Sequence, residues 1–391
     1  MLLRNLQWIK NGSLVNGDIR IHDSLIHETG LSLLPQKKER TLTFDNHFLY
    51  PGLINAHDHL EMNLYPNLGN PPYDNYTQWA ADIYRPQESP VKEIEAIPLG
   101  DRLLWGGIKN LISGVTTVVH HNPFHRDLKS SSFPVRVLQK YAWAHSIAFE
   151  KNLVSKFPGD TDTPFVIHAA EGVDDFAHSE IEKLRGLNVL RQNTVLIHAV
   201  GLNAQDRDFI QASDASIVWC PSSNLFMFNQ TADIEAVKKK IKVALGSDST
   251  MTGKATFFEE MRAAFNTTQV SASEIVEFVT SQPQKIFRLP GLKLEPGQAA
   301  DLLILPKKRE DYSENLVMNS SANVTAVIVS GELRFGDLEI AKDLGLSNGS
   351  VRVGSKEKWV AFDIKALMSR ISSRTGSEFF QKNPLWNLLE S

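Results

Sequence analysis

The sequence predicts an α/β protein whose larger part is a closed barrel of parallel strands. Between residues 49 and 290, seven apolar runs typical of buried strands alternate with longer stretches of helical pattern. This alternation is typical of successive strand–helix units, and seven such strands favour a closed barrel. Short strand patterns also occur near both ends of the chain, which predicts a second, smaller β unit.

The barrel strands and helices follow from the spacing of apolar residues. Helical spacing by three and four predicts helices over residues 257–265 and 273–287, and residues 179–187 form a further amphipathic stretch. Most of the predicted strands end in a polar residue. They cover residues 49–59, 115–121, 135–145, 164–168, 194–198, 215–220 and 241–248.

The smaller β unit is predicted from turn signals and alternation. Asn11-Gly12 and Asn16-Gly17 are typical of hairpin turns, and residues 18–22 alternate polar with apolar side chains. Strand patterns return at residues 300–305 and 324–331. We therefore expect the two ends of the chain to share one sheet.

The composition excludes several classes of protein. Of 391 residues, 42% are hydrophobic and 22% charged, as in soluble globular proteins. A net charge of -4 provides no basic field for nucleic acid. The single cysteine, Cys220, excludes an intrachain disulfide and a metal cage of thiolates. Since the sequence has no signal-peptide pattern at its start and no apolar run of about 18 residues, we expect a cytoplasmic protein without a membrane partner. The sequence leaves open whether the protein forms a homo-oligomer.

Histidines are concentrated where a barrel would have its active site. All 12 histidines precede residue 199, and several close a predicted strand. In a barrel of strand–helix units the active site forms at the carboxyl ends of the strands. A polar residue that closes an apolar strand there is therefore a candidate for catalysis.

Four of these strand-end residues form a candidate metal site. Since side chains on a strand alternate between its faces, His57 and His59 share one face and Asp58 points away. Taken alone, this pair could equally be two polar residues at a strand end. His168 and Asp248 close two further strands, and zinc accepts imidazole and carboxylate ligands while leaving one position for water.

The order and spacing of several motifs resemble the amidohydrolase superfamily. Residues 51–59 (PGLINAHDH) are similar to its first-strand motif, with both histidines in place. The match is collinear over roughly residues 1–335. Its other motifs are residues 114–118 (GVTTV), 221–224 (PSSN), 245–248 (LGSD) and 296–302 (PGQAADL).

The resemblance implies a (β/α)8 TIM-type barrel over residues 51–290, with one divalent metal, zinc first and iron as the alternative. It implies a small β-sandwich built from residues 1–50 and 291–345, and residues 346–391 remain as a C-terminal appendage. The metal ligands would be His57, His59, His168 and Asp248. The segment 168–171 (HAAE) is similar to the HxxE motif of the deaminase and chlorohydrolase branch.

That branch also implies catalytic roles. Glu171 would transfer protons to the substrate, Asp248 would take a proton from the attacking water, and His198 would polarise that water, unless His198 is a hydrogen-bonded core residue. Amidases with two metals need a carboxylated lysine at a strand end. Lys140 is the only strand lysine in the right region, and it is predicted to lie in mid-strand. A site with one metal is therefore favoured.

Other polar residues are candidates for substrate binding. They are His120 or His121, of which only one can face the barrel mouth, together with His145 and Asn224. Each could instead satisfy a local hydrogen bond. The long loop after His59 is rich in aromatic residues, which could stack on a flat substrate or only pack the loop.

The chain departs from an eight-stranded barrel in one region. His168 follows His121 by 47 positions, and one strand, residues 135–145, can be placed between them where two are needed. Either the fourth strand lies within residues 147–157, or the region of strands 3 and 4 is reduced.

The sequence thus predicts a metal-dependent hydrolase of non-peptide carbon–nitrogen bonds. The first hypothesis is an aminohydrolase, or deaminase, that attacks an amino-substituted carbon of a nucleobase-like heterocycle and releases ammonia. A chlorohydrolase or cyclic amidase using the same metal site is the alternative enzyme. A barrel that serves only as an inactive scaffold is the third hypothesis.

Overall fold

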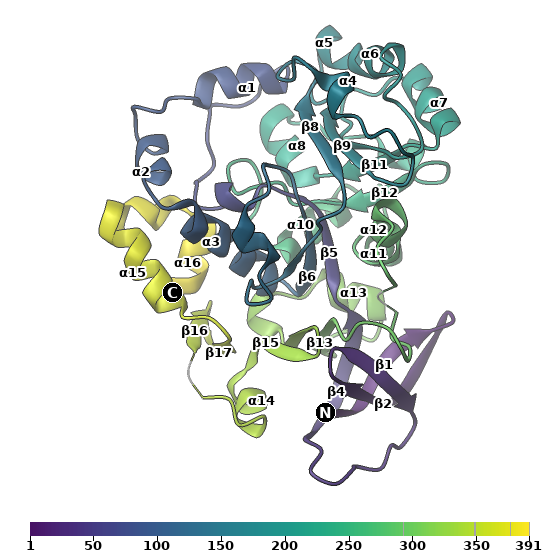
Figure 1. Ribbon diagram of the computed structural model, residues 1–391, viewed down its shortest axis with the longest axis vertical. Helices are drawn as coiled ribbons and strands as arrows, with labels where there is room; N and C mark the ends of the chain where they lie inside the picture. The colour runs from purple at the N-terminus through teal and green to yellow at the C-terminus, as the bar shows by residue number, and fades with distance from the viewer. Residues whose placement is uncertain (292, 348, 376, 391) are drawn as a thin grey trace.

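The computed structural model describes residues 1–291, 293–347, 349–375 and 377–390 (Figure 1). Its centre consists of two parallel sheets. One has the order β12(Lys242–Leu245), β11(Ser216–Trp219), β10(Thr194–His198), β9(Phe165–Ala169), β8(Ala142–Ser146). The other has the order β5(Leu53–Asp58), β6(Val115–His120), β7(Arg136–Val137). The predicted α/β class with parallel strands is confirmed.

The two parallel sheets meet at β5 and β12. The backbone amides of Ser247 and Asp248, just after β12, both donate to the carbonyl of His57 at 3.0 Å. On the other side of β5, β6 and β7 are paired in parallel, and the amide of Leu138 donates to Val118. The carboxyl ends of β5 and β12 therefore lie side by side, which brings their terminal residues together.

The region between β6 and β9 is short, and the single strand predicted over residues 135–145 is wrong. Residues 135–145 form two short strands, β7 and β8, separated by a loop and not by a helix. Residues 147–157 contain a helix, α4(Leu153–Lys156), and no strand. The connection between β7 and β8 has been reduced to a few residues, because too little chain is available for a helical crossover.

The predicted strand 49–59 is also divided. It bends at Gly52, so that β4(Thr41–Pro51) and β5 belong to different sheets. Gly52 is required at the bend because a side-chain carbon would overlap Thr116. The bend takes the chain out of the sheet of β4 and into β5, which carries His57 and is followed by His59.

Helices surround the parallel strands. The predicted helix 257–265 is present as α10, which buries Phe257, Phe258 and Met261, whereas residues 273–287 form two helices, α11 and α12. The helices are α1(Tyr76–Ile83), α2(Val91–Glu95), α3(Leu99–Leu111), α5(Asp175–His178), α6(Glu180–Gly186), α7(Ala204–Ser213), α8(Pro221–Phe228), α9(Ile234–Val237), α10(Phe257–Asn266), α11(Ala272–Phe278) and α12(Ser281–Phe287).

Strands from both chain ends form one nine-stranded sheet, as expected, and in Figure 1 the N-terminal strands lie beside the late green ones. The central pairing is antiparallel, between β4 and β13(Leu302–Pro306). The order is β16(Ser350–Val353), β17(Lys356–Val360), β15(Glu332–Asp337), β14(Ala326–Val329), β13, β4, β1(Leu2–Lys10), β2(Ser13–His22), β3(Leu25–Gly30).

The last part of the described chain packs against the loop that follows β5. It contains α15(Ile364–Thr375) and α16(Pro384–Glu390), which lie near α3 in Figure 1. Trp386 contacts Trp105 of α3 at 5.3 Å between ring centroids, and the side-chain amide of Asn383 donates to the carbonyls of Asn63 and Tyr65 at 3.0 Å. None of the helices in the described ranges has the length and apolar character needed to cross a membrane.

Candidate metal centre and active site

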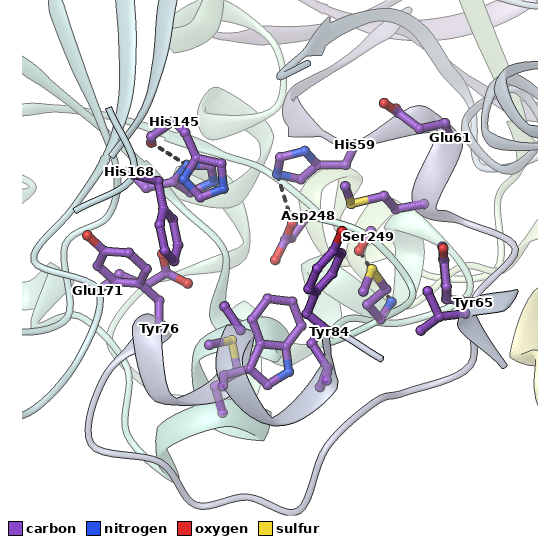
Figure 2. Close-up of a pocket in the computed structure, with 18 of the residues that line it drawn as sticks. His59, Glu61, Tyr65, Tyr76, Tyr84, His145, His168, Glu171, Asp248 and Ser249 are labelled. Atoms are coloured by element: carbon purple, nitrogen blue, oxygen red, sulfur yellow. Dashed lines mark hydrogen bonds and ion pairs between the residues drawn. The ribbon is translucent and has the colours of Figure 1, made fainter. Parts of the chain in front are cut away.

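The strand-end residues predicted as metal ligands converge on one cavity. His57 and His59 extend from β5, His168 from β9 and Asp248 follows β12, and all four are buried. The Oδ1 atom of Asp248 lies 3.7 Å from Nε2 of His57 and 3.6 Å from Nε2 of His59. Figure 2 shows the imidazole of His59 turned toward the Asp248 carboxylate. His57, His59 and His168 present ligand atoms within 4.8 Å of one another.

Hydrogen bonds fix which nitrogen of His57 faces the centre. Nε2 of His121 lies 3.0 Å from the carbonyl oxygen of Ala144, which can only accept, so this nitrogen carries the proton. Nδ1 of neutral His121 is then an acceptor, and it receives the Nδ1 proton of His57 at 3.4 Å. This leaves Nε2 of His57 with a free lone pair, and that buried atom has no hydrogen-bond partner.

His168 is oriented in the same manner. Its Nδ1 donates to the carbonyl oxygen of His145 at 2.7 Å, so its Nε2 is the free ligand atom. A second hydrogen bond of this kind is typical of metal-binding histidines. Burial lowers the pKa of His168 well below its usual value, and lowers that of His57 to about 4. Both imidazoles are therefore neutral, as metal ligation requires.

Asp248 supplies the negative charge of the cluster. Although burial alone would raise its pKa, the neighbouring imidazoles of His57, His59 and His198 hold that pKa well below its usual value. Its Oδ2 atom accepts hydrogen bonds from Ser223 at 2.8 Å and Thr252 at 2.9 Å. These two donors leave Oδ1 directed at the histidines.

The donor set fits a divalent metal. Three imidazoles and one carboxylate, with an orphaned lone pair on Nε2 of His57, match the nitrogen and oxygen ligands that zinc accepts. Among the described residues there is no thiolate near the cluster, since Cys220 is buried with a pKa raised well above normal by burial. Lys140 is exposed and does not contribute a bridging ligand.

Glu171 and His198 lie next to the cluster. Oε1 of Glu171 is 3.5 Å from Nε2 of His198. Together with His168, these two residues form a second group of side chains that could hold a metal ion. Burial raises the pKa of Glu171 well above its usual value, and the charges of Asp248 and Glu180 add to the effect. The raised pKa favours the protonated form of Glu171, which can donate a proton into the cavity.

Two of these residues have strained backbones. His198 has a φ of 73° and Asp248 a φ of 51°, in the left-handed region that few residues other than glycine adopt. Such conformations cluster at functional sites, because the surrounding structure has to hold them in place. At these strand ends the backbone turn directs each side chain toward the centre.

The cluster opens into a cavity of about 670 Å³, a volume typical of sites for small organic ligands. His59, His168, Glu171, His198 and Asp248 form its polar end. Rings from the loop after β5 form much of the remaining wall, as Figure 2 shows for three tyrosines. The ring- and sulfur-bearing lining residues are Met62, Tyr65, Tyr76, Trp79, Tyr84, Phe149, Met227 and Met251.

Of the four residues predicted to bind substrate, the cavity lining includes His145. The remaining three lie behind the wall, so the structure does not support direct contact with substrate. His120 is fully buried, and its Nδ1 accepts from the Leu60 amide at 3.4 Å. His121 lies behind His57, and Oδ1 of Asn224 accepts from Nδ1 of His198 at 2.8 Å.

Sequence reasoning missed several residues at the site. Glu61 and Ser249 line the cavity, each close in sequence to a predicted ligand. Lys109 of α3 reaches the backbone carbonyl of Asp248 at 3.2 Å. A lysine in an amphipathic helix gives no sequence signal of this kind, because the pattern does not show which helix face lies beneath the strand ends.

Comparisons with known proteins agree with this geometry. The sequence model of the amidohydrolase family matches residues 141–334. The chain is 22% identical to the 5'-deoxyadenosine deaminase of Methanococcus vannielii, over 83% of this chain and 93% of that protein. It is also 22% identical to the 5-methylthioadenosine/S-adenosylhomocysteine deaminase of Pyrococcus furiosus, over 83% and 94% of the two chains.

Solved structures show a similar fold. A zinc-bound adenosine deaminase from Xanthomonas campestris superposes with a TM-score of 0.68 at 17% identity, covering 95% of this chain and 97% of that chain. A zinc complex of atrazine chlorohydrolase from Arthrobacter aurescens TC1 gives a TM-score of 0.74 at 15% identity, with coverage of 95% and 99%. At these identities the likeness describes the fold.

Proposed function

We propose that the chain is a member of the amidohydrolase superfamily, in its branch of deaminases and chlorohydrolases, and that it deaminates the base of an adenosine-like nucleoside. The observation that best supports the proposal is the position of Glu171. A buried carboxyl group whose pKa is raised by its burial lies 3.5 Å from His198, beside a cluster suited to one metal.

We assign the metal to His57, His59, His168 and Asp248, with zinc as the first candidate and iron as the alternative. A divalent metal held there would lower the pKa of water toward about 7 and would supply a hydroxide nucleophile at neutral pH. The chain's own contribution is to hold two of the three imidazoles in the tautomer that ligation needs. His121 and the carbonyl of His145 do so for His57 and His168.

The reaction then needs two proton positions. Asp248 accepts the proton of the attacking water at Oδ1, because Oδ2 is already bonded to Ser223 and Thr252. Glu171 donates its proton to the ring nitrogen beside the amino-bearing carbon, and the proton taken by Asp248 passes to the leaving amine. As ammonia leaves and the oxo group forms, the proton of the new hydroxyl group returns to Glu171. Water and the aminated ring are consumed, while the oxo-substituted ring and ammonia are formed. General acid–base help of this kind contributes about 10²–10⁴-fold.

His198 orients the attacking water through Nε2. Its Nδ1 proton is held by Asn224, whose own amide donates to Thr231 at 3.2 Å. We therefore assign Asn224 to positioning His198 and not to substrate contact. His145 is the remaining candidate for direct contact with the substrate.

The cavity supports a nucleoside over a bare base. The cavity has a volume of about 670 Å³ and extends beyond its polar end. The remainder is lined largely by aromatic and methionine side chains. Aromatic faces stack on flat rings. The named relatives act on 5'-deoxyadenosine, or on methylthioadenosine and S-adenosylhomocysteine, which are adenine nucleosides with altered 5' groups. We propose this substrate class for the present chain.

We also propose that the two parallel sheets form a (β/α)8 barrel with a reduced connection between β7 and β8, and that the nine-stranded sheet forms the β-sandwich of the family. The domain boundaries and the cytoplasmic location expected from the sequence remain predictions. Chlorohydrolysis on the same metal site remains the second enzymatic hypothesis, and its support is the fold likeness to a chlorohydrolase.

A substrate screen tests the proposal. Purified zinc-loaded protein is incubated with adenosine, 5'-deoxyadenosine, methylthioadenosine, S-adenosylhomocysteine, cytidine and a chlorotriazine, and ammonia and chloride are measured. We expect ammonia from adenine nucleosides, with the corresponding hypoxanthine nucleoside as product. Chloride release without ammonia release would favour the chlorohydrolase, and release of neither would contradict the proposed function.

A further inference from the structure

A buried lysine lies directly behind the proposed metal ligands. Lys109 of α3 is only 1% exposed, and its Nζ lies within hydrogen-bond distance of three oxygens. These are Oδ2 of Asp58 at 3.2 Å, Oγ of Ser247 at 3.0 Å and the backbone carbonyl of Asp248 at 3.2 Å. Asp58 lies between His57 and His59, so one ammonium group contacts both segments that carry ligands.

The partner of this lysine is a fully buried carboxylate. Asp58 receives four further hydrogen bonds. Asn63 donates to Oδ1 at 2.8 Å, and Oδ2 accepts from Asn110 at 2.8 Å, Asn55 at 3.2 Å and Oγ of Ser247 at 3.3 Å. The buried pair is thus surrounded by donors that satisfy it. Removing one member of such a pair is costly, because the other charge is left buried and uncompensated.

The network spans the junction between β5 and β12. These strands are not neighbours in a hydrogen-bonded ladder. The side-chain amide of Asn55 donates to Oγ of Ser247 at 2.7 Å, and the amide of Ser247 donates back to Oδ1 of Asn55 at 3.0 Å. Lys109 connects α3 to this junction, because its Nζ donates to the backbone carbonyl of Asp248, the residue with the left-handed backbone conformation.

We propose that Lys109 is a positioning residue for the metal centre. Together with Asp58 and Ser247 it fixes the histidines of β5 relative to Asp248, so that all ligand atoms meet at one point. The inference rests on the proposed function, in that it assigns the same residues to a metal.

Three variants test the role of Lys109. Lys109→Met removes the ammonium group, Lys109→Met with Asp58→Asn removes both charges and so avoids a buried unpaired carboxylate, and Ser247→Ala removes one hydroxyl. Lys358→Met is the matched control. Lys358 is equally buried and contacts Asp337 and the carbonyl of Val324, but it lies in the nine-stranded sheet.

The readouts are zinc affinity, by competition with a chromophoric chelator, and the visible absorption spectrum of the cobalt-substituted protein. Folding is followed by circular dichroism. Loss of residues that support metal ligands typically lowers metal affinity about 10–100-fold. We expect a loss of this size, with altered cobalt bands, in the double variant and in Ser247→Ala. Lys358→Met should lose stability but bind zinc as the wild type does.

The outcomes separate this inference from the proposed function. If the wild type binds zinc and the folded double variant binds it equally tightly with unchanged cobalt bands, Lys109 has only a structural role and the inference is wrong. If Lys109→Met alone does not fold, the double variant and Ser247→Ala decide the question. If the wild type binds no zinc, the proposed metal site itself is contradicted.

Discussion

Nδ1 of His57 lies 3.4 Å from Nδ1 of His121, and His121 is in turn bonded to the carbonyl of Ala144. This chain of donors determines that His57 presents Nε2 to the centre. Replacing His121 with Phe would leave the Nδ1 proton of His57 without an acceptor and free the imidazole to turn. We expect zinc affinity to fall about 10–100-fold, measured by chelator competition. His125→Phe, in the loop after β6, is the control, and equal affinity in both variants would contradict the tautomer assignment.

Glu171→Gln removes the proton donor without changing its shape. We expect kcat for ammonia release to fall by about 10²–10⁴-fold, since general acid catalysis is worth that much. Zinc content should stay the same, because Glu171 is not assigned as a ligand. Full activity in this variant would refute the proton-transfer role, whereas loss of zinc would place Glu171 in the ligand set.

Asn224→Ala tests the orientation of His198. Without the acceptor at 2.8 Å, the imidazole of His198 can rotate away from the attacking water. We expect kcat to fall with little change in KM, because Asn224 lies outside the cavity lining. Asn224→Asp keeps an acceptor oxygen and should retain more activity than the alanine variant. A large rise in KM alone would instead favour the direct substrate contact that the sequence suggested.

Glu180 should make the protein less stable as the pH rises from about 5 to about 7. Burial raises its pKa to about 7, while it accepts hydrogen bonds from Tyr76 and the amide of Ala170. A carboxyl group whose pKa is raised by folding contributes stability below its unfolded pKa of about 4.3, and this contribution is lost as pH rises through about 7. The shift corresponds to roughly 4 kcal/mol.

Urea unfolding between pH 5 and pH 8 measures this effect. The free energy of unfolding of the wild type should decrease over this range, and the decrease should be smaller in Glu180→Gln, which cannot ionise. Burial also raises the pKa of Glu260 to about 7. Some decrease in the free energy of unfolding should therefore remain in Glu180→Gln. Parallel pH profiles for the wild type and the Glu180 variant would show that Glu180 does not ionise in this range.

The sequence predicted the ligand cluster better than its surroundings. His57, His59, His168 and Asp248 could be found because each ends an apolar strand, and the carboxyl ends of parallel strands meet. Asn224 could not be placed in the same way. Its motif indicated a polar contact but did not show whether the partner would be the substrate or a neighbouring side chain. The partner is His198, and this depends on how α8 packs behind that residue.

Contacts between distant segments gave no sequence signal. The buried lysine in α3 follows an ordinary helical pattern, and its partner Asp58 was correctly predicted only to point away from the centre. The division of residues 135–145 into β7 and β8 was equally hidden, because two short strands without a helix between them leave one apolar run. Both features are set by tertiary packing and not by local pattern.

Metal reconstitution tests the central claim most directly. The protein is stripped with a chelator, zinc is returned in steps, and metal content and ammonia release from 5'-deoxyadenosine are measured on the same samples. We predict that ammonia release is absent without metal, rises in proportion to zinc and reaches its maximum at one zinc per chain. Activity in the stripped protein, or a maximum only at two metals per chain, would contradict a deaminase with a single metal held by His57, His59, His168 and Asp248.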